Sequence, residues 1–398
     1  MKYILLVMFV LFETLSAETL EEILTLHKES SFVKSIGFKR DAQVAKNSLV
    51  DSFEAPRVGV KTAYAQENTQ DGFEYAVGFT QTMTTPFASG AKKDFKENLN
   101  LALKQETKHE LHIMELDITS RYYAACSTKA LYEVAQKLQK QQEQTLSALQ
   151  EAYRVGEISK KQLLFHKFDA VKLQQKILEY QRSYQEEFGE LVRSIGVGEI
   201  KNLTCSDLRP PQSEIFVKDV LQHGEVKRIE YEKSAAVAAT QIYDTSISDL
   251  GYELLYEHEL QTERYSFMLS IPLGGLSEQK ELLRTQAMSQ SSAYKYERDA
   301  LIYSVTQETK RAQKRLYSLY EEYSLLQNEL LPMSKELLEL AKYAYNEGEG
   351  SLMEYLDATR SFKETNIESL ELQKRYYEEL FELYKVTDME YGEKICIE

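Results

Sequence analysis

The sequence is poor in residues that interrupt helices and in clustered cations. Its 398 residues include only 6 Pro and 16 Gly, so long continuous helices are permitted. Trp is absent, whereas 27 Tyr are present, and Tyr suits surfaces with one apolar and one wet side. Acidic residues exceed basic ones and give a formal net charge of −15. This balance argues against nucleic acid as a partner, because phosphate binding needs clustered Lys and Arg.

Long apolar runs are also missing, so we expect no membrane-spanning helix in the mature chain. The N-terminus has Lys2 followed by an apolar run from Ile4 to Phe12 and small residues at Ser16 and Ala17. This order predicts a secretory signal peptide over residues 1–17, and a short membrane anchor is the alternative. Export would place the three cysteines in an oxidising compartment, where they can pair.

The chain repeats itself, at an offset of 192 residues in the second pair of matching segments along the chain and of 186 residues in the first. "AYRVGEISKKQLLFHKFDA" from Ala152 resembles "AYNEGEGSLMEYLDATRSF" from Ala344, and "TTPFASGAKKDF" from Thr84 resembles "SIPLGGLSEQKEL" from Ser270. We interpret residues 18–208 and 209–398 as two structural repeats of one intertwined protomer, with a junction near "LRPPQS" (208–213).

Each repeat contains one very long helix, which we expect over about 91–155 and 277–347. Each would be roughly 100 Å long, which exceeds a globular helix. Pro332 should bend or break the second helix locally. Long helices alone would fit an ordinary cytosolic coiled-coil scaffold. The second helix carries apolar residues at alternating spacings of three and four, typical of a coiled-coil seam: Leu316, Leu319, Tyr323, Leu326, Leu330, Met333, Leu337, Leu340 and Ala344.

Two hairpins, at about 57–82 and 248–272, alternate between an apolar, aromatic face and a small or polar face. Their strands have about ten residues, enough to cross a bilayer on a tilt, and this pattern is typical of outer-membrane barrels. Four strands are too few for a closed barrel, and membranes do not tolerate open strand edges, so several chains must share one barrel. Three copies would supply twelve strands. The aromatics expected to face lipid are Tyr64, Phe73, Tyr75, Phe79, Tyr252, Tyr256, Tyr265 and Phe267.

The duplicated order, the two hairpins, the "PFASG" and "IPLGG" segments and the "YNEG…LDAT" segment together resemble the TolC-like outer membrane efflux channel family. The resemblance covers nearly the whole mature chain. It implies a mainly α fold in which three chains build an α-barrel tunnel of long coiled-coil helices, continued by a shared 12-stranded transmembrane β-barrel.

By the same resemblance, the chain would lie in the outer membrane of a Gram-negative-type bacterium and extend into the periplasm. It would passively conduct substrates from a periplasmic adaptor protein and an inner-membrane pump to the exterior, in efflux or type I secretion, without catalysis or a cofactor. The alternative is a periplasmic coiled-coil adaptor or scaffold of an export system.

The segment from Tyr345 to Phe362 would then form part of the periplasmic tip. Gly156 and Gly348 should end the long helices, since Gly tolerates a left-handed cap. Glu354 and Asp357 are three residues apart and share a helix face. The resemblance assigns them to an acidic ring at the pore constriction, which would attract cations. The alternative is that both acids are solvated charges near a helix start.

The first-repeat equivalents of the two acids are Gln162 and Phe165, so the duplication is asymmetric here. Some members of the family latch the tip with an arginine, but this chain has Gly350 at that position and retains the latch tyrosine as Tyr345. We therefore expect a gate that uses other contacts, such as Lys160 or Lys161 with the acids.

Cys205 and Cys396 occupy equivalent ends of the two repeats, and the tunnel architecture implied by the resemblance would bring those ends close together. We expect a Cys205–Cys396 disulfide, with two free thiols as the alternative, and we interpret Cys126 as a small core residue.

His109 and His112 could begin a metal site, but without further ligands we interpret them as helix surface, and we predict no metal. A glycosidase-like role for Glu354 and Asp357 would need a cleft that a coiled-coil hairpin does not offer. We find no other enzymatic motif.

Overall fold

A computed structural model of the chain describes residues 18–66, 71–198, 200–205, 211–212, 217, 219–272 and 278–390. The expected signal peptide, most of the expected repeat junction and Cys396 lie outside these residues. The chain divides into two compact units. The hairpin unit comprises Met1–Ser35, Glu110–Lys218 and Val305–Glu398, and the sheet unit comprises Ile36–His109 and Asp219–Ser304. Each unit therefore contains segments from both predicted repeats.

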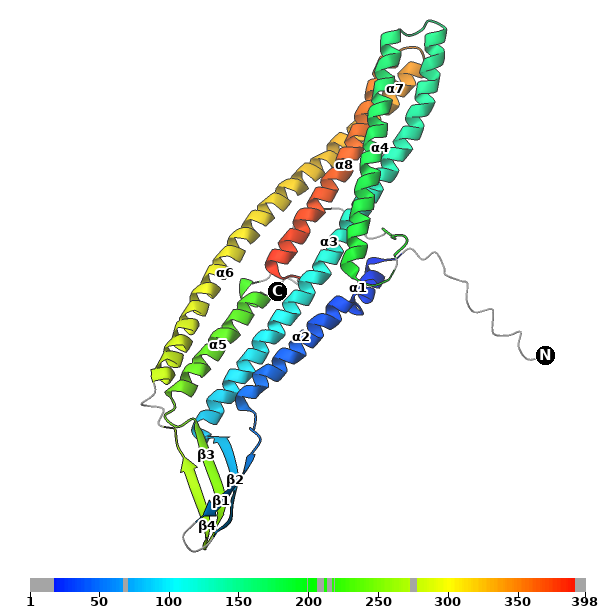
Figure 1. Cartoon of the computed structure of the whole chain (residues 1–398). Coiled ribbons are helices and arrows are strands. Elements are labelled where there is room, and N and C mark those ends of the chain that lie inside the picture. Colours follow the sequence, from blue (N-terminus) through cyan, green and yellow to red (C-terminus); the bar gives the residue numbers. More distant parts are fainter. Residues whose placement is uncertain are drawn as a thin grey trace, which may run out of the picture. The chain divides into compact units, whose positions relative to one another are not determined.

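The sheet unit contains one antiparallel sheet of four strands in the order β1-β2-β3-β4 (Figure 1). The strands are β1 (Arg57–Gln66), β2 (Asp71–Thr84), β3 (Asp249–Glu259) and β4 (Thr262–Ser270), which confirms both predicted hairpins. Because β1 and β4 are the outer strands, each has one edge without a neighbour in the described sheet.

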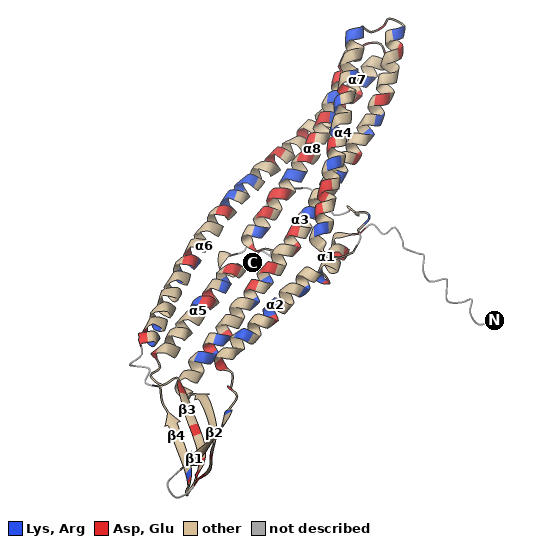
Figure 2. Cartoon of the chain, in the orientation of Figure 1, with Lys and Arg blue, Asp and Glu red and all other residues tan. Residues whose placement is uncertain are grey.

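The register places the predicted apolar residues of the four strands in rows across one face. Val60 pairs with Val77, Val77 with Tyr256, and Tyr256 with Tyr265. The Tyr256 and Tyr265 rings lie 5.0 Å apart. Residues of this face are open to the surroundings, and Tyr265 is 77% exposed. Charged residues are sparser on the strands than on the helices (Figure 2).

The helical part of the sheet unit consists of most of α2 (Ser31–Ser48), α5 (Gly224–Asp244) and the N-terminal parts of α3 and α6. Short 3₁₀ turns precede β1 (Leu49–Asp51) and α5 (Val220–Gln222). Arg298 of α6 lies 2.8 Å from Glu230 of α5, so an ion pair joins these two helices.

The hairpin unit contains α1 (Leu20–Lys28), α4 (Lys160–Ile195), α7 (Leu331–Asn346), α8 (Leu352–Thr387) and the C-terminal parts of α3 and α6. Figure 1 shows α4 returning beside α3 and α8 returning beside α7. Its largest core cluster combines α3 with α8: the ring of Tyr123 lies 4.8 Å from Tyr377 and 5.3 Å from Phe381. Leu131 of α3, Ile177 of α4 and Ile367 of α8 form a second cluster nearer the tips of the hairpins.

The long helices occur where the sequence predicts them. Helix α3 runs without a break from Pro86 to Arg154, a length of about 100 Å. The second long helix consists of α6 (Glu278–Leu325), a π-helical turn (Leu326–Leu330) and α7. The turn ends just before Pro332, which has no N–H for the helical ladder, and Leu331 donates to the carbonyl of Leu326 instead. The predicted local break is therefore confirmed. In the described part of the chain, no helix has an apolar stretch that could cross a membrane.

The prediction that Cys205 forms a disulfide with Cys396 is wrong. Cys205 is bonded to Cys126, with the two Cα atoms 5.4 Å apart. The reason is the geometry of the α3–α4 hairpin. Helix α4 runs back along α3 for 36 residues, so the segment that follows it ends beside the middle of α3, where Cys126 lies buried. Cys126 is thus a core residue, as predicted, but it is not a free thiol.

Candidate functional site

The tips of the two helical hairpins have the same turn, built by the same backbone hydrogen bonds. At the first tip, the N–H of Glu157 donates to the carbonyl of Ala152 at 2.9 Å, and Gly156 has φ 84°. At the second, the N–H of Glu349 donates to the carbonyl of Ala344 at 2.9 Å, and Gly348 has φ 78°. The repeat offset seen in the sequence is therefore also a structural repeat at the tips, and Gly156 and Gly348 end their helices as predicted.

Each tip continues into a helix that starts with a capping box. In α8, the backbone N–H of Ser351 donates to Oε2 of Glu354 at 2.8 Å, and the N–H of Glu354 donates to Oγ of Ser351 at 3.2 Å. In α4, Ser159 and Gln162 make the same two contacts, at 2.8 and 3.3 Å. Glu354 thus has the helix-start role of the alternative interpretation, and Gln162 shows that this role does not require a charge.

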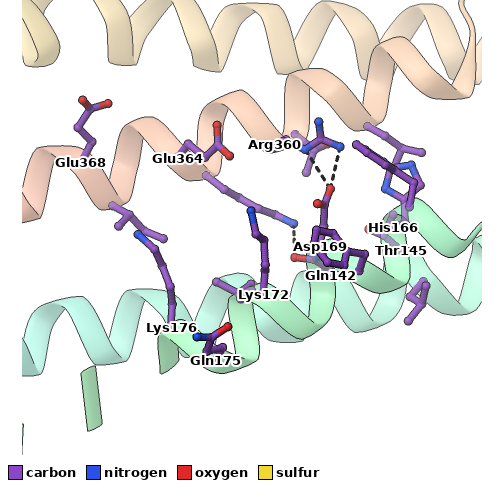
Figure 3. A pocket seen from close by; sticks show the side chains of 18 of the residues that line it. Gln142, Thr145, His166, Asp169, Lys172, Gln175, Lys176, Arg360, Glu364 and Glu368 are labelled. Carbon is purple, nitrogen blue, oxygen red and sulfur yellow. Dashed lines mark hydrogen bonds and ion pairs between the residues drawn. The ribbon is translucent and has the colours of Figure 1, made fainter. Parts of the chain in front are cut away.

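Asp357, the second predicted acid, pairs with an arginine on its own helix that in turn binds the other hairpin. Arg360 lies 3.5 Å from Asp357, and its Nη2 lies 2.7 Å from Asp169 of α4. Its Nε donates to Asp169 at 3.0 Å, and its guanidinium carbon lies 4.6 Å from the centre of the Phe165 ring. In Figure 3, Arg360 and Asp169 point toward each other from α8 and α4. Arg360 therefore joins the two hairpins near their tips.

We expected Lys160 or Lys161 to contact the acids Glu354 and Asp357 at the tip, and the described part of the chain shows no such contact. Neither Lys160 nor Lys161 forms an ion pair within the described residues, and both are exposed. Tyr345 stacks on Tyr355 of the same tip, with ring centres 5.9 Å apart.

Gly350 occupies a crowded position, where an added Cβ would lie 2.9 Å from the Cβ of Ala344. This close approach accounts for Gly where the family resemblance led us to look for an arginine.

A cavity of about 830 Å³ lies between α3, α4 and α8, beside the Arg360–Asp169 pair (Figure 3). His166 of α4 lines it and is buried, and burial lowers the pKa of its imidazole. Lys363 of α8 also lines it, and its Nζ donates to Oε1 of Gln142 on α3 at 3.1 Å. Burial lowers the pKa of Lys363 to about 8.

Sequence reasoning missed Arg360, Asp169, His166 and Lys363. The repeat alignment carries a signal for two of them, because Arg360 aligns with Phe168 and His166 aligns with Ala358 at the same offset. A polar residue that replaces an apolar one between two repeats marks a position where the two halves have different contacts. The sequence gives no sign of which acid Arg360 would reach.

The histidines singled out earlier do not form a metal site. His112 lies with its Nε2 3.0 Å from the carbonyl oxygen of Met389. The ring of His109 lies 5.3 Å from that of His223. Within the described residues, no group of three or more His, Cys, Asp and Glu side chains could hold a metal ion.

No protein-family model and no curated protein matches the sequence. Solved structures do match. The MtrE outer membrane channel of Neisseria gonorrhoeae matches with a TM-score of 0.75 at 16% identity, over 92% of this chain and 88% of that one. CusC, described in relation to transmembrane channel formation, matches with a TM-score of 0.76 at 15% identity, over 92% and 91%. The CmeC outer membrane channel of Campylobacter jejuni matches with a TM-score of 0.72 at 12% identity, over 92% and 85%. The chain therefore has the fold of these outer-membrane channels, as the sequence resemblance predicts.

Proposed function

We propose that this chain is one protomer of a trimeric outer-membrane channel. The observation that carries the proposal is the four-stranded sheet, which combines one apolar, aromatic face with two edges that have no partner strand among the described residues. An open sheet edge is not tolerated in lipid, so the β4 edge of one copy would pair with the β1 edge of the next. Three copies would then close a barrel of twelve strands with its aromatic face toward lipid.

The hairpin unit supports a shared helical tunnel. Leu330, Met333, Leu337 and Leu340 on the second long helix are all at least 45% exposed, and they follow one another at spacings of three, four and three. An exposed seam of this kind is typical of a helix that packs against another helix. In the proposed trimer, the partner helix belongs to the neighbouring protomer.

The tips would form the narrow periplasmic end of this tunnel. Glu354 and Asp357 are both exposed, so three copies would place six carboxylates around one axis and favour cations. The pair of Arg360 and Asp169 would hold the second hairpin against the first and keep this end narrow. The channel would open when these contacts are released by a periplasmic adaptor and an inner-membrane pump, which supply the energy. The channel itself would catalyse no reaction.

The proposal is tested by a matched pair of variants in β4. Phe267 belongs to the apolar face and is 64% exposed, whereas its neighbour Ser266 points to the other face. We expect Phe267→Arg to reduce the amount of protein in the outer-membrane fraction strongly, because arginine on a lipid face costs about 2–4 kcal/mol at the midplane. Ser266→Arg should insert normally. Equal insertion of both variants, or release of the parent protein without detergent, would contradict the proposal.

A further inference from the structure

The cavity between α3, α4 and α8 has an apolar wall and two polar groups whose hydrogen bonds or charges are incompletely satisfied within the described residues. Leucine and isoleucine side chains from three helices form the wall: Leu146, Leu149, Leu173, Leu356 and Ile367. Among the many polar residues of the lining, the two that carry the argument are the imidazole of His166 and the ammonium of Lys363. This combination is typical of sites that bind a small molecule with an apolar body and one polar group.

His166 is only 7% exposed, and its Nε2 has no hydrogen-bond partner among the described residues. A buried nitrogen without a partner costs free energy that a ligand oxygen could recover. Burial keeps the pKa of His166 low, and the charges of Arg360 and Lys363 lower it further against the opposing effect of Asp169 and Asp357. Burial therefore favours the neutral imidazole, and its Nε2 can donate one hydrogen bond when the proton is on that nitrogen.

Lys363 is a half-buried cation, and the only acid that favours its charged form among the described residues, Asp169, is already bound by Arg360. Within the described residues its Nζ contacts the amide oxygen of Gln142 and forms no ion pair. With a pKa of about 8 it still carries its charge at neutral pH. A desolvated ammonium that meets only a neutral oxygen is poorly compensated, and an anion would stabilise it.

The acids that line the cavity are already occupied or solvated. Asp169 is bound by Arg360. Glu371 lies 3.5 Å from Lys176 and accepts a hydrogen bond of 2.6 Å from the hydroxyl of Tyr180. Glu179, Glu364 and Glu368 are exposed to water. Of these acids, Asp169 favours the charged form of Lys363 electrostatically, while Arg360 and burial oppose it. None of them forms an ion pair with Lys363 within the described residues, so its ammonium can still accept an anion from outside.

We propose that this cavity binds an amphipathic carboxylate, an organic acid with an aromatic or short alkyl body. Its carboxylate contacts Lys363 and His166, and its body packs against the leucine wall. A cavity of about 830 Å³ accommodates one ligand of this size. Because such a ligand touches both hairpins, it stabilises their association. The inference does not rest on the proposed transport function.

The test is isothermal titration calorimetry on the purified full-length protein in an amphipathic polymer, with 4-phenylbutyrate as the probe and the neutral 4-phenylbutyramide as its matched control. We expect the carboxylate to bind at least about tenfold more tightly than the amide, since hydrogen bonds to charged groups are the stronger ones. Equal affinity for the two probes, or no heat from either at millimolar concentration, would overturn the proposal.

Variants locate the site. Lys363→Met should weaken binding of 4-phenylbutyrate about tenfold or more, while Lys363→Arg should retain most of it. His166→Phe keeps a ring of similar size but removes the donor, so it should weaken binding about three- to tenfold. Lys161→Met changes an exposed lysine outside the cavity and should have no effect. Unchanged affinity in both Lys363→Met and His166→Phe would refute this site. The readout needs no conductance, so it can fail or succeed independently of the channel proposal.

Discussion

Arg360 of α8 lies 2.7 Å from the carboxylate of Asp169 on α4, and these two residues, 191 apart in sequence, join the two hairpins. Both side chains are about a quarter to a third exposed. The same guanidinium covers the ring of Phe165. It therefore combines a charge-assisted hydrogen bond with a cation–π contact at the base of the tips.

Replacing Arg360 should loosen the proposed gate. For Arg360→Gln we expect a loss of about 1–2 kcal/mol between the hairpins and a severalfold higher open probability in planar bilayers. Arg154→Gln is the control, because the ion pair between Arg154 and Glu151 is on the surface and lies within one helix. If both variants gate like the parent, Arg360 has no gating role.

Glu354→Gln should remove the charge and keep the capping box with Ser351 at the start of α8. Gln makes the same capping box at the equivalent position in the first repeat, so Glu354→Gln should leave the unfolding midpoint unchanged. Combined with Asp357→Asn, it would remove six charges from the proposed trimer and lower cation selectivity, measured as a smaller reversal potential in a salt gradient. An unaltered reversal potential would mean that the two acids do not line the constriction.

Gly350 should not tolerate a side chain. A Cβ at this position would lie 2.9 Å from the Cβ of Ala344, so Gly350→Ala should destabilise the tip by about 1–3 kcal/mol and speed hydrogen exchange there. Gly189 is in the interior of α4 with nothing within 4 Å of an added Cβ. Gly189→Ala should therefore stabilise the helix by about 0.5–1 kcal/mol. Slower exchange at the tip in Gly350→Ala would contradict this reading.

The disulfide assignment predicts one free thiol. Alkylation of the intact protein should modify a single cysteine, Cys396, and reduction should release two more, Cys126 and Cys205. Cys205→Ser should cost about 2–5 kcal/mol of stability, because the bond closes a loop of 79 residues, while Cys396→Ser should have little effect. A peptide map that links Cys396 to either of the others would refute the assignment.

Lys363 should make stability depend on pH in the alkaline range. Its pKa in the folded chain is about 8, against an ordinary value of 10.5. The folded state therefore releases the proton first as pH rises, and stability increases between these two values. Below pH 8 the penalty for the buried charge is fully present. The denaturant midpoint of the parent should rise from pH 7 to pH 9.5 relative to that of Lys363→Met. Parallel pH profiles would show that Lys363 is not desolvated.

The sequence was sufficient for the architecture and much less so for the tip. Strict alternation identified the strands, because a sheet with one apolar face needs a period of two, and Pro332 marked the break because its ring removes a hydrogen bond. The contacts of Arg360 could not be predicted, since its partner depends on how α4 and α8 align side by side. The disulfide could not be predicted for the same reason. Cys205 and Cys396 occupy equivalent positions in the two sequence repeats, but the partner of Cys205 is Cys126, because α4 runs back along α3.

The most direct test of the account is single-particle imaging of the protein extracted in detergent from the outer-membrane fraction. We expect a particle with three-fold symmetry, in which β4 of each chain pairs with β1 of the next and the barrel has twelve strands. A protein that leaves the membrane without detergent, or a particle without three-fold symmetry, would contradict it.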